Sequence, residues 1–378
     1  MKRLIFILIG SFIAVSIISL FIKPTIIFLA KKQLTKVFID STVTVKNCNL
    51  RPLRLLSLSD IEIKREQIYD IKIKEVSIQY TPLSIIRGNI LKISLKDSQI
   101  AINLGGKSLL GFSKLLNLNT SKSPFLINSL ELTNLILNIK SQELTLDARL
   151  SSELNLIKQL INSLNLKINS LEAEGLDLKN ASLRTAQLLP SGSLYVEQIK
   201  YDKLKIEKIK SNVRLKDKSL FLDSLTALFL GGEVQGDLSF LIDKPLEYLI
   251  NLKVRDIDLN AFVHDFKLEE KVNISGRLNG VTVLKGSGLN FTLLDGEFST
   301  NAPGGDLTIK DKSYLEKIAR GSGQSLDILV ENFKNYHYNK GVMDLSLEDG
   351  NLILDIALDG ETGKRNFTVT MHNFNLGR

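Results

Sequence analysis

Hydrophobic and polar residues alternate along most of the chain after residue 42. In stretches such as Leu144 to Leu150 and Leu352 to Leu358, every second residue is apolar. A period of two is typical of β-strands with one buried and one solvated face. Strands of this kind favour antiparallel sheets, because the strands of parallel sheets are usually buried on both faces. The pattern therefore predicts a mainly β fold built from antiparallel strands.

The phase of this alternation slips by one residue inside many of the strands. Asp60, Asn134 and Asp256 stand at three of the slips, and both residue types are common in turns. A slip would turn the apolar side chains outward unless a β-bulge or a corner restores their facing. Repeated bends of this sort predict an elongated, curled antiparallel sheet (a β-taco) with one apolar concave face.

A few segments have helical patterns instead. Thr81 to Asn89 begins with Pro and ends with Gly, which predicts one or two turns of helix. Apolar residues at helical spacing between Ser152 and Leu164 predict a second helix, and capping and periodic patterns predict helices near residues 313–336. Asp349-Gly350 predicts a tight hairpin turn.

The start of the chain is its most apolar segment. After Lys2 and Arg3, Leu4 to Ile22 contains nineteen residues without a charge. A helix of that length nearly crosses a hydrocarbon core of about 30 Å. No A-x-A cleavage pattern follows, so we expect an uncleaved transmembrane signal anchor within residues 1–30. Lysines after the segment weakly favour the inside, so charge alone does not set the orientation.

Candidate chemistry is sparse. The single Cys48 excludes an internal disulfide, and His264, His337 and His372 have no metal-ligand spacing. No GxSxG elbow, P-loop or paired-carboxylate motif occurs. We therefore expect a protein that is not an enzyme and that uses no cofactor and no metal.

The net charge of +8 does not indicate a nucleic-acid partner. Basic residues mostly stand singly between apolar ones, and no Lys/Arg-rich run is interleaved with aromatic residues that would stack on bases. A solvated strand face that carries lysines explains this charge better, so we expect no nucleic acid to bind.

Glycines interrupt one strand pattern in a way that needs an explanation. The stretch LFLGGEVQGDLSF, Leu228 to Phe240, contains Gly231, Gly232 and Gly236 beside alternating apolar residues. Glycine weakens a strand, but it allows tight bends and close backbone approach. We interpret Gly231 and Gly232 as positions where the sheet bends and Gly236 as a clearance position on its apolar side.

Several of these segments resemble the AsmA-like superfamily. Val43 to Leu104, with VSIQYTPLSIIRGNILKISLKDSQIAI, is similar to the start of such proteins, and LFLGGEVQGDLSF resembles their Gly-Gly strand. Ile274 to Leu376 is most similar to the YdbH-type branch. There ISGRLNGV, LLDGEFSTNAPGGDLTI, LDILVENFKNYHYNKGVMDLSLEDGNLILDIALDG and FTVTMHNFNL follow in that family's order. The resemblance is weakest from Lys107 to Gln198.

This resemblance implies a Gram-negative periplasmic protein, anchored once in the inner membrane, with a hydrophobic groove that passes phospholipids between the inner and outer membranes. It divides the chain into an anchor at 1–30, an AsmA-like β region at 31–110, a β-rich middle region at 111–200 and a YdbH-like β-groove region at 201–378. It also suggests that a small outer-membrane partner docks at the edge of the final strand, Phe367 to Leu376.

The expected groove lining is the set of apolar residues that alternate along the strands of the C-terminal region. These residues are Val234, Leu238, Phe240, Ile250, Leu252, Val254, Val272, Ile274, Leu278, Leu345, Leu347, Leu354, Ile356 and Leu358. The alternative is that they meet a second sheet and form a closed core. In that case the protein would be an anchored β-rich scaffold of the cell envelope that carries no lipid.

Overall fold

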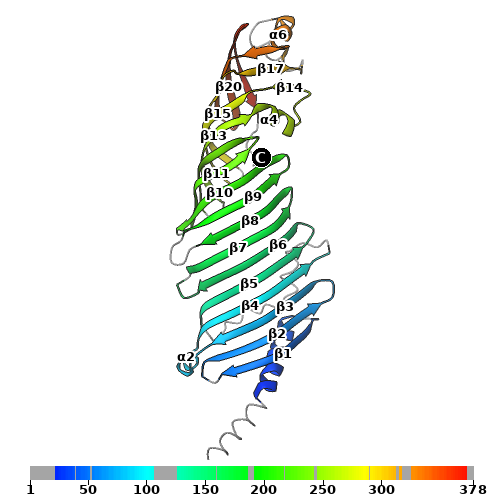
Figure 1. Ribbon diagram of the computed structural model, residues 1–378, viewed down its shortest axis with the longest axis vertical. Helices are drawn as coiled ribbons and strands as arrows, with labels where there is room; N and C mark the ends of the chain where they lie inside the picture. The colour runs from blue at the N-terminus through cyan, green and yellow to red at the C-terminus, as the bar shows by residue number, and fades with distance from the viewer. Residues whose placement is uncertain are drawn as a thin grey trace, which may run out of the picture. The chain divides into compact units, whose positions relative to one another are not determined.

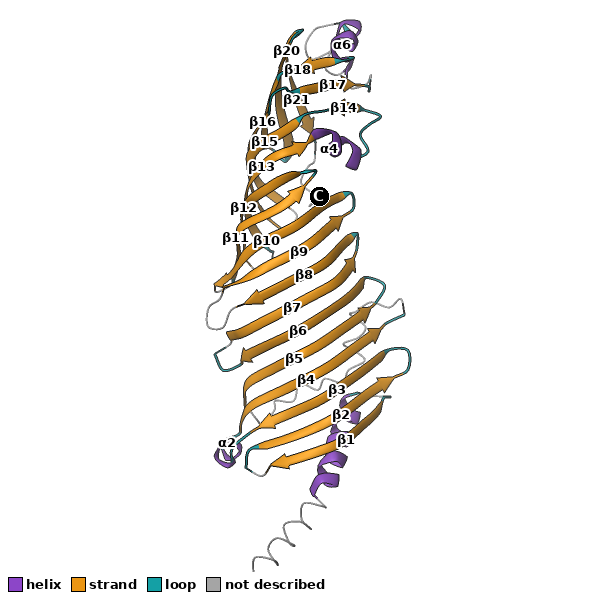
Figure 2. Ribbon diagram, in the orientation of Figure 1, coloured by secondary structure: helices purple, strands orange, loops and turns teal. Residues whose placement is uncertain are grey.

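Two compact units make up the chain. The structure, a computed structural model, describes residues 22–38, 40–51, 53–105, 126–158, 160–185, 191–216, 218–241, 245–288, 290–311, 315–316 and 325–372. Unit 1 comprises Met1–Glu174 with Asn180–Leu189, and unit 2 comprises Gly175–Lys179 with Pro190–Arg378. Both units consist mainly of β-strands with few helices, as the alternation of apolar and polar residues predicts (Figure 2).

The described part of unit 1 is a sheet with a short helix at its margin and a longer helix at residues 22–37 (Figure 1). Its elements are β1 (Thr42–Arg51), β2 (Leu55–Arg65), β3 (Tyr69–Gln79), α2 (Pro82–Ile86), β4 (Asn89–Asn103), β5 (Leu126–Lys140), β6 (Leu144–Asn155) and β7 (Leu160–Ala173). The next strand, β8 (Leu176–Thr185), contributes residues to both units.

Unit 2 contains a larger sheet and a second, three-stranded one. Its strands are β9 (Ser191–Tyr201), β10 (Leu204–Lys216), β11 (Ser219–Phe229), β12 (Gly232–Leu241), β13 (Glu247–Asp258), β14 (Val272–Ile274), β15 (Arg277–Ser287), β16 (Asn290–Thr300), β17 (Gly305–Ile309), β18 (Tyr336–Tyr338), β19 (Lys340–Glu348), β20 (Asn351–Gly360) and β21 (Gly363–Met371). Its helices are α4 (Leu259–Asp265) and α6 (Leu326–Phe333).

Among the strands that the structure describes, pairing is antiparallel with one exception. Successive strands β1 to β4, β5 to β7 and β9 to β13 pair antiparallel, as do β13–β15, β15–β16, β16–β19, β19–β20 and β20–β21. β4 and β5, however, pair parallel. Parallel neighbours require a long connection, and the chain between Asn103 and Leu126 is long enough to return to the same edge of the sheet.

The strands are interrupted at the three predicted phase slips, by a residue of positive φ at each slip and by a β-bulge at two of them. Asp60, Asn134 and Asp256 have φ angles of 52°, 56° and 55°. The strand register shifts next to Asn134 and Asp256, between Leu132 and Leu135 and between Val254 and Ile257. Aspartate and asparagine tolerate this left-handed conformation better than most residues. The backbone therefore absorbs each slip within one or two residues, and the apolar side chains keep facing the same side.

Three residues of unit 1 with positive φ, Asp60, Asp97 and Asn134, lie beside one another across neighbouring strands. The strand register aligns Lys46, Asp60, Lys74, Asp97, Asn134 and Ser151 in one row from β1 to β6, which we call the crease. Asn134 Nδ2 donates to Asp97 Oδ1 at 2.8 Å, and Lys74 Nζ lies 3.7 Å from Asp97 Oδ2. The hydrogen bond from Asn134, reinforced by Lys74, lowers the pKa of Asp97. Polar side chains thus follow the crease on the solvent side.

No sheet is strongly curled, so the strong curl expected from the sequence is not observed. In unit 1 the slips of adjacent strands align in the crease. Each strand that carries a slip there is interrupted at one shared line, and several interruptions along each strand would be needed to roll the sheet into a strongly curled trough.

The helices agree with prediction in part. α2 is confirmed, with Thr81 as its N-cap in a reciprocal capping box with Ser84. α6 is confirmed within the region 313–336. The helix expected between Ser152 and Leu164 is wrong: β6 ends at Asn155 and β7 begins at Leu160. Residues of that segment have both a helical and a strand period, and pairing with neighbouring strands decides between them.

Residues 22–37 form a helix that packs on unit 1. Its Ile27 and Leu34, with Phe38 after it, contact a core cluster from β1 to β4 that includes Ile63 and Tyr69. The predicted anchor, Leu4 to Ile22, lies outside the described residues except for its last residue. No helix within the described ranges has the length and apolar character that a membrane crossing requires.

Candidate functional site

One face of the larger sheet of unit 2 is apolar over seven neighbouring strands: β12, β13, β15, β16, β19, β20 and β21. One row of paired residues across these strands runs Val234, Val254, Gly280, Phe298, Met343, Ile356 and Phe367. The next row runs Gly236, Leu252, Thr282, Gly296, Leu345, Leu354 and Val369. We call this surface the apolar face. The alternating positions between these residues, such as Lys253 and Glu297, form the opposite, polar face.

Most side chains of the apolar face are half-buried. Leu252, Phe298 and Leu345, near its centre, belong to this class, whereas Val234 at one end is only 9% exposed. Side chains beneath a second sheet would be almost fully buried. The partial exposure is that expected for a sheet face in contact with solvent or with a removable ligand.

Glycines on the apolar face lie under aromatic rings. A Cβ on Gly280 would come 2.4 Å from the ring of Phe298, and one on Gly286 would come 2.3 Å from the hydroxyl of Tyr248. Gly296 lies under the other side of the Phe298 ring, with 2.9 Å to Cε2. The rings thus fill the space that side chains at these positions would occupy, and the apolar surface continues across the glycines.

The three glycines singled out in the sequence have different surroundings. Gly231 has φ of 71° in the turn that joins β11 and β12. At Gly232 a Cβ would come 2.4 Å from the carbonyl oxygen of Arg255, and at Gly236 it would come 2.0 Å from that of Asn251. Gly232 and Gly236 therefore permit the close approach of β12 and β13.

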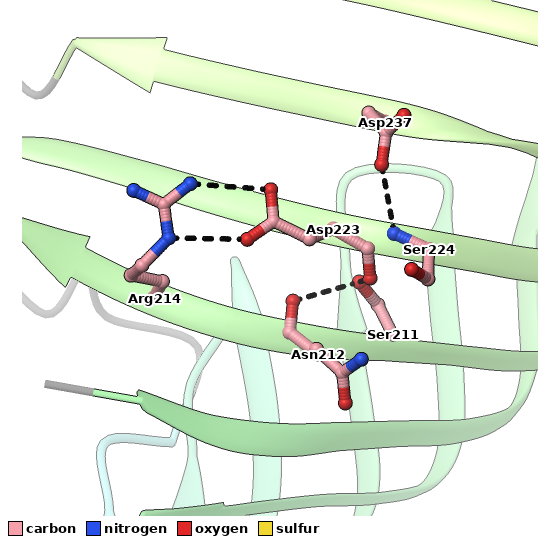
Figure 3. Close-up of polar contacts among 6 residues, drawn as sticks. All are labelled: Ser211, Asn212, Arg214, Asp223, Ser224 and Asp237. Carbon is pink, nitrogen blue, oxygen red and sulfur yellow. Dashed lines mark hydrogen bonds and ion pairs between the residues drawn. The ribbon is translucent and has the colours of Figure 1, made fainter. Parts of the chain in front are cut away.

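β11 pairs with β12, the first strand of the apolar face, and contains a bulge whose backbone N–H is hydrogen-bonded by a side chain. Ser224 has φ of 55°, and its N–H donates to Asp237 Oδ1 of β12 at 2.8 Å (Figure 3). On the strand before it, Arg214 forms a two-pronged contact with Asp223, at 3.2 and 3.4 Å. Asp256, in the bulge of β13, is hydrogen-bonded in the same way, because its N–H donates to Asn279 Oδ1 at 3.0 Å. Neighbouring side chains thus replace the strand hydrogen bonds that the bulges lose.

The fourteen predicted lining residues fall into three groups. Val234, Leu238, Phe240, Ile250, Leu252, Val254, Leu278, Leu345, Leu347 and Leu354 lie on strands of the larger sheet, β12, β13, β15, β19 and β20. Val272 and Ile274 lie instead in β14 of the small sheet. Ile356 and Leu358 lie at the end of the larger sheet, where the small sheet packs.

The small sheet and α6 cover that end of the apolar face. Tyr336 and Tyr338 are 1% and 0% exposed in a cluster with Phe333 and Leu358. The Tyr338 hydroxyl donates to the Ser275 carbonyl at 2.5 Å, and burial raises its pKa to about 12. Phe333 of α6 lies edge-on to Phe367, with 6.0 Å between ring centroids. We call this assembly of α6 and the small sheet the cap.

Several residues of the apolar face were absent from the predicted lining. Phe298, Met343, Leu284 and Leu294 belong to it through their register with predicted neighbours. Glycines and Thr282 interrupt the apolar alternation of β15 and β16. The pattern of these two strands therefore did not mark them as part of the lining. Treating glycine as a permitted member of the alternation would have found them.

The fold and this face define a class of mainly β proteins with a one-sided, open antiparallel sheet. The chain belongs to the YdbH-like family: the family model described as YdbH-like, intermembrane phospholipid transport protein YdbH, matches residues 138–365. This match confirms the resemblance stated from the sequence, and it includes part of the stretch in which that resemblance was weakest. No curated protein and no solved structure matches the chain significantly.

Proposed function

We propose that this chain transfers phospholipids between the inner and outer membranes by holding their acyl chains on the apolar face. The observation that carries the proposal is the row of apolar residues from β12 to β20, half-exposed near its centre, in a chain that belongs to an intermembrane phospholipid transport family. In this proposal the face serves as the floor of a hydrophobic groove lined by the ten expected residues that lie outside the cap, whereas Val272, Ile274, Ile356 and Leu358 pack in the cluster of the cap.

The physical mechanism needs no catalytic group. Each CH₂ removed from water contributes about 0.8 kcal/mol, so a strip of apolar side chains binds an acyl chain without a specific pocket. Leu, Ile, Val and the ring-covered glycines offer similar surfaces at successive strands. A lipid can therefore move from one strand to the next without a deep free-energy minimum, while its headgroup stays in water.

We further propose the setting implied by the sequence. The segment Leu4 to Ile22 anchors the chain once in the inner membrane, and the rest of the chain lies in the periplasm. The helix at residues 22–37 supports this arrangement, because it follows the segment along the chain and packs on strands β1 to β4. A small outer-membrane partner is proposed to pair with the free side of β21, which pairs only with β20 among the described strands.

Photo-crosslinking of adjacent residues on opposite faces tests the proposal. A photoreactive amino acid replaces Leu252, on the apolar face, or Lys253, the next residue, on the polar face. In cells, we expect phospholipid adducts at position 252 and few at position 253. Leu252→Glu should abolish transport and Lys253→Glu should not, because only the first places a charge among acyl chains.

The same experiment separates the proposal from the scaffold alternative. A scaffold predicts no adducts at either position and near-normal envelope function in Leu252→Glu protein that is folded. Equal adducts at both positions would also contradict the proposal, because they would indicate nonspecific contact with lipid. Circular dichroism and urea unfolding of both variants verify that the sheet is intact.

A further inference from the structure

The margin of unit 1 carries exposed apolar side chains that its core does not use. Outside the helix at 22–37, every exposed large apolar residue in the described part of unit 1 lies at one edge of the sheet. Four side chains gather where β1 and β2 connect and in α2: Leu53, Leu83, Ile85 and Ile86 are 63%, 56%, 39% and 81% exposed. Leaving such side chains in water is unfavourable, so they indicate an interaction surface.

The two segments that carry these side chains are joined to each other. The Tyr80 N–H, next to the N-cap of α2, donates to the Arg54 carbonyl at 3.0 Å. The Thr81 capping box fixes the start of α2, and the buried Ser84 hydroxyl donates to the Thr81 carbonyl at 2.8 Å. The apolar side chains of α2 therefore project from a fixed backbone. We call the turn between β1 and β2, together with α2, the foot.

Charge around the foot is positive. Arg51, Arg54 and Arg87 are exposed, and none of them forms an ion pair with a described residue. The sequence contains no Asp or Glu from Arg51 to Ser59 or from Val76 to Lys96. Exposed apolar side chains ringed by arginines, without acidic residues, match the interface of a bilayer that contains anionic phospholipids.

We propose that the foot inserts its apolar side chains into the headgroup region of an anionic phospholipid bilayer. Only the choice of the inner membrane rests on the proposed function and its anchor. The anchor-side helix at 22–37 packs on β1 to β4 of the same unit, and α2 lies toward the β1 end of that sheet (Figure 1). Two contacts with one bilayer restrict the orientation of unit 1 more than an anchor alone.

Depth-dependent quenching in vesicles tests the foot directly. The full chain, with Cys48→Ala, receives a single cysteine at Ile86 or at Ile157, and each is labelled with an environment-sensitive fluorophore. Ile157 is the matched control because it lies at the same edge, in the turn between β6 and β7, and is 65% exposed. The protein is reconstituted in vesicles of phosphatidylethanolamine and phosphatidylglycerol with lipids that carry a quencher.

We expect strong quenching at position 86 and at least severalfold weaker quenching at position 157. Arg51→Glu, Arg54→Glu and Arg87→Glu together should remove most of the signal at 86, because each basic residue near an anionic surface changes partitioning roughly fivefold. Vesicles of phosphatidylcholine alone should reduce it as well. The proposal would be wrong if the label at position 86 were not quenched, or if the labels at 86 and 157 were quenched equally. It would also be wrong if the three charge reversals left the quenching at 86 unchanged.

The outcome is distinguishable from that of the transport proposal. Lipid adducts at Leu252 with an unquenched label at 86 would refute the foot and leave the transport function standing. Quenching at 86 without adducts at 252 would establish the foot and refute the groove. Capture of the foot by a protein would leave position 86 unquenched in protein-free vesicles, and so counts against the proposal.

Discussion

At two glycines of the apolar face, the aromatic ring of Phe298 occupies the space that a side chain would fill. Gly280 and Gly296 lie on paired strands beneath the two edges of Phe298. Glycine in a strand costs roughly 0.5–1 kcal/mol in backbone entropy. The ring offsets this cost by covering both positions with apolar surface that stays level with neighbouring leucines. The arrangement gives a smooth face where two larger side chains would form ridges.

Gly280→Ala tests this packing. A methyl group at this position would meet both the Phe298 ring and the carbonyl oxygen of Glu297, each 2.4 Å from the built Cβ. We expect the free energy of unfolding to fall by about 2 kcal/mol, measured by urea unfolding of the full chain. Val281→Ala, on the adjacent exposed residue, is the control and should change stability by less than about 0.5 kcal/mol. Equal effects of the two substitutions would contradict the ring-over-glycine packing.

Residue types alone predicted part of this detail. Asp60, Asn134 and Asp256 are predicted to be bulges or corners because a phase slip and a turn-forming residue coincide in the sequence, and all three have positive φ. The role of Phe298 was not predictable in the same way. Its partner glycines lie on its own strand and on the paired one, and only the register between β15 and β16 brings them under the ring.

At the scale of elements, the polar face of unit 1 contains buried groups of its own. Ser57, Ser77 and Ser94 form one row across β2, β3 and β4 and are 6%, 6% and 2% exposed. Ser94 Oγ donates to Glu131 at 2.7 Å, and Lys92 lies 3.3 Å from the same carboxylate. The hydrogen bond from Ser94, followed by the contact with Lys92, lowers the pKa of Glu131.

This lowered pKa gives a pH dependence of defined sign. Because the folded pKa lies below the unfolded one, the interaction stabilises the fold above the unfolded pKa and is lost as pH falls through the folded pKa. Ser94→Ala should therefore lower the free energy of unfolding by about 1 kcal/mol at neutral pH. The difference from the wild-type protein should shrink in acid, as measured by urea unfolding across the carboxyl range.

Ser77→Ala is the matched control for this pH dependence. Ser77 is buried in the same row but does not contact Glu131, so its substitution should cost the same at every pH. A Ser94→Ala difference that is constant across pH would show that Glu131 is not stabilised through this serine.

Elements were predictable to the extent that their signals are local. The strand period, the capping box of α2 and the Asp349-Gly350 turn, with φ of 49° and 77°, all arise from residues close in sequence. The parallel pairing of β4 with β5 and the small sheet of β14, β17 and β18 depend on contacts between distant segments. Strands of three to five residues carry too little alternation to be recognised.

At the scale of the molecule, the free side of β21 determines how the chain can be extended. β20 and β21 form a hairpin closed by the pair Gly360 and Gly363. Backbone groups point alternately toward the partner and away from it along a strand. Counting from the closing pair, the N–H of Thr370 points to the free side, where a partner strand would accept it.

Thr370→Pro tests docking on this side without disturbing the hairpin. Proline removes the outward N–H, so we expect crosslinking of a small outer-membrane protein to a photoreactive residue at Lys364 to fall roughly tenfold, the effect of about 1.4 kcal/mol. Thr370→Ala keeps the N–H and should retain the crosslink. Undiminished crosslinking in the proline variant, with an unchanged melting temperature, would exclude strand addition at β21. Residues 373–376 of the expected docking strand lie outside the described part of the chain.

The crease of unit 1 also restricts how such a chain can change in evolution. A single-residue insertion in one strand would displace its residue of positive φ from the row formed by Asp60, Asp97 and Asn134, and would reverse the facing of every side chain beyond it. Loss or duplication of a whole antiparallel hairpin leaves the remaining residues of the row aligned. Homologous proteins should therefore differ in length by pairs of strands, with single-residue insertions confined to the turns at the sheet edges.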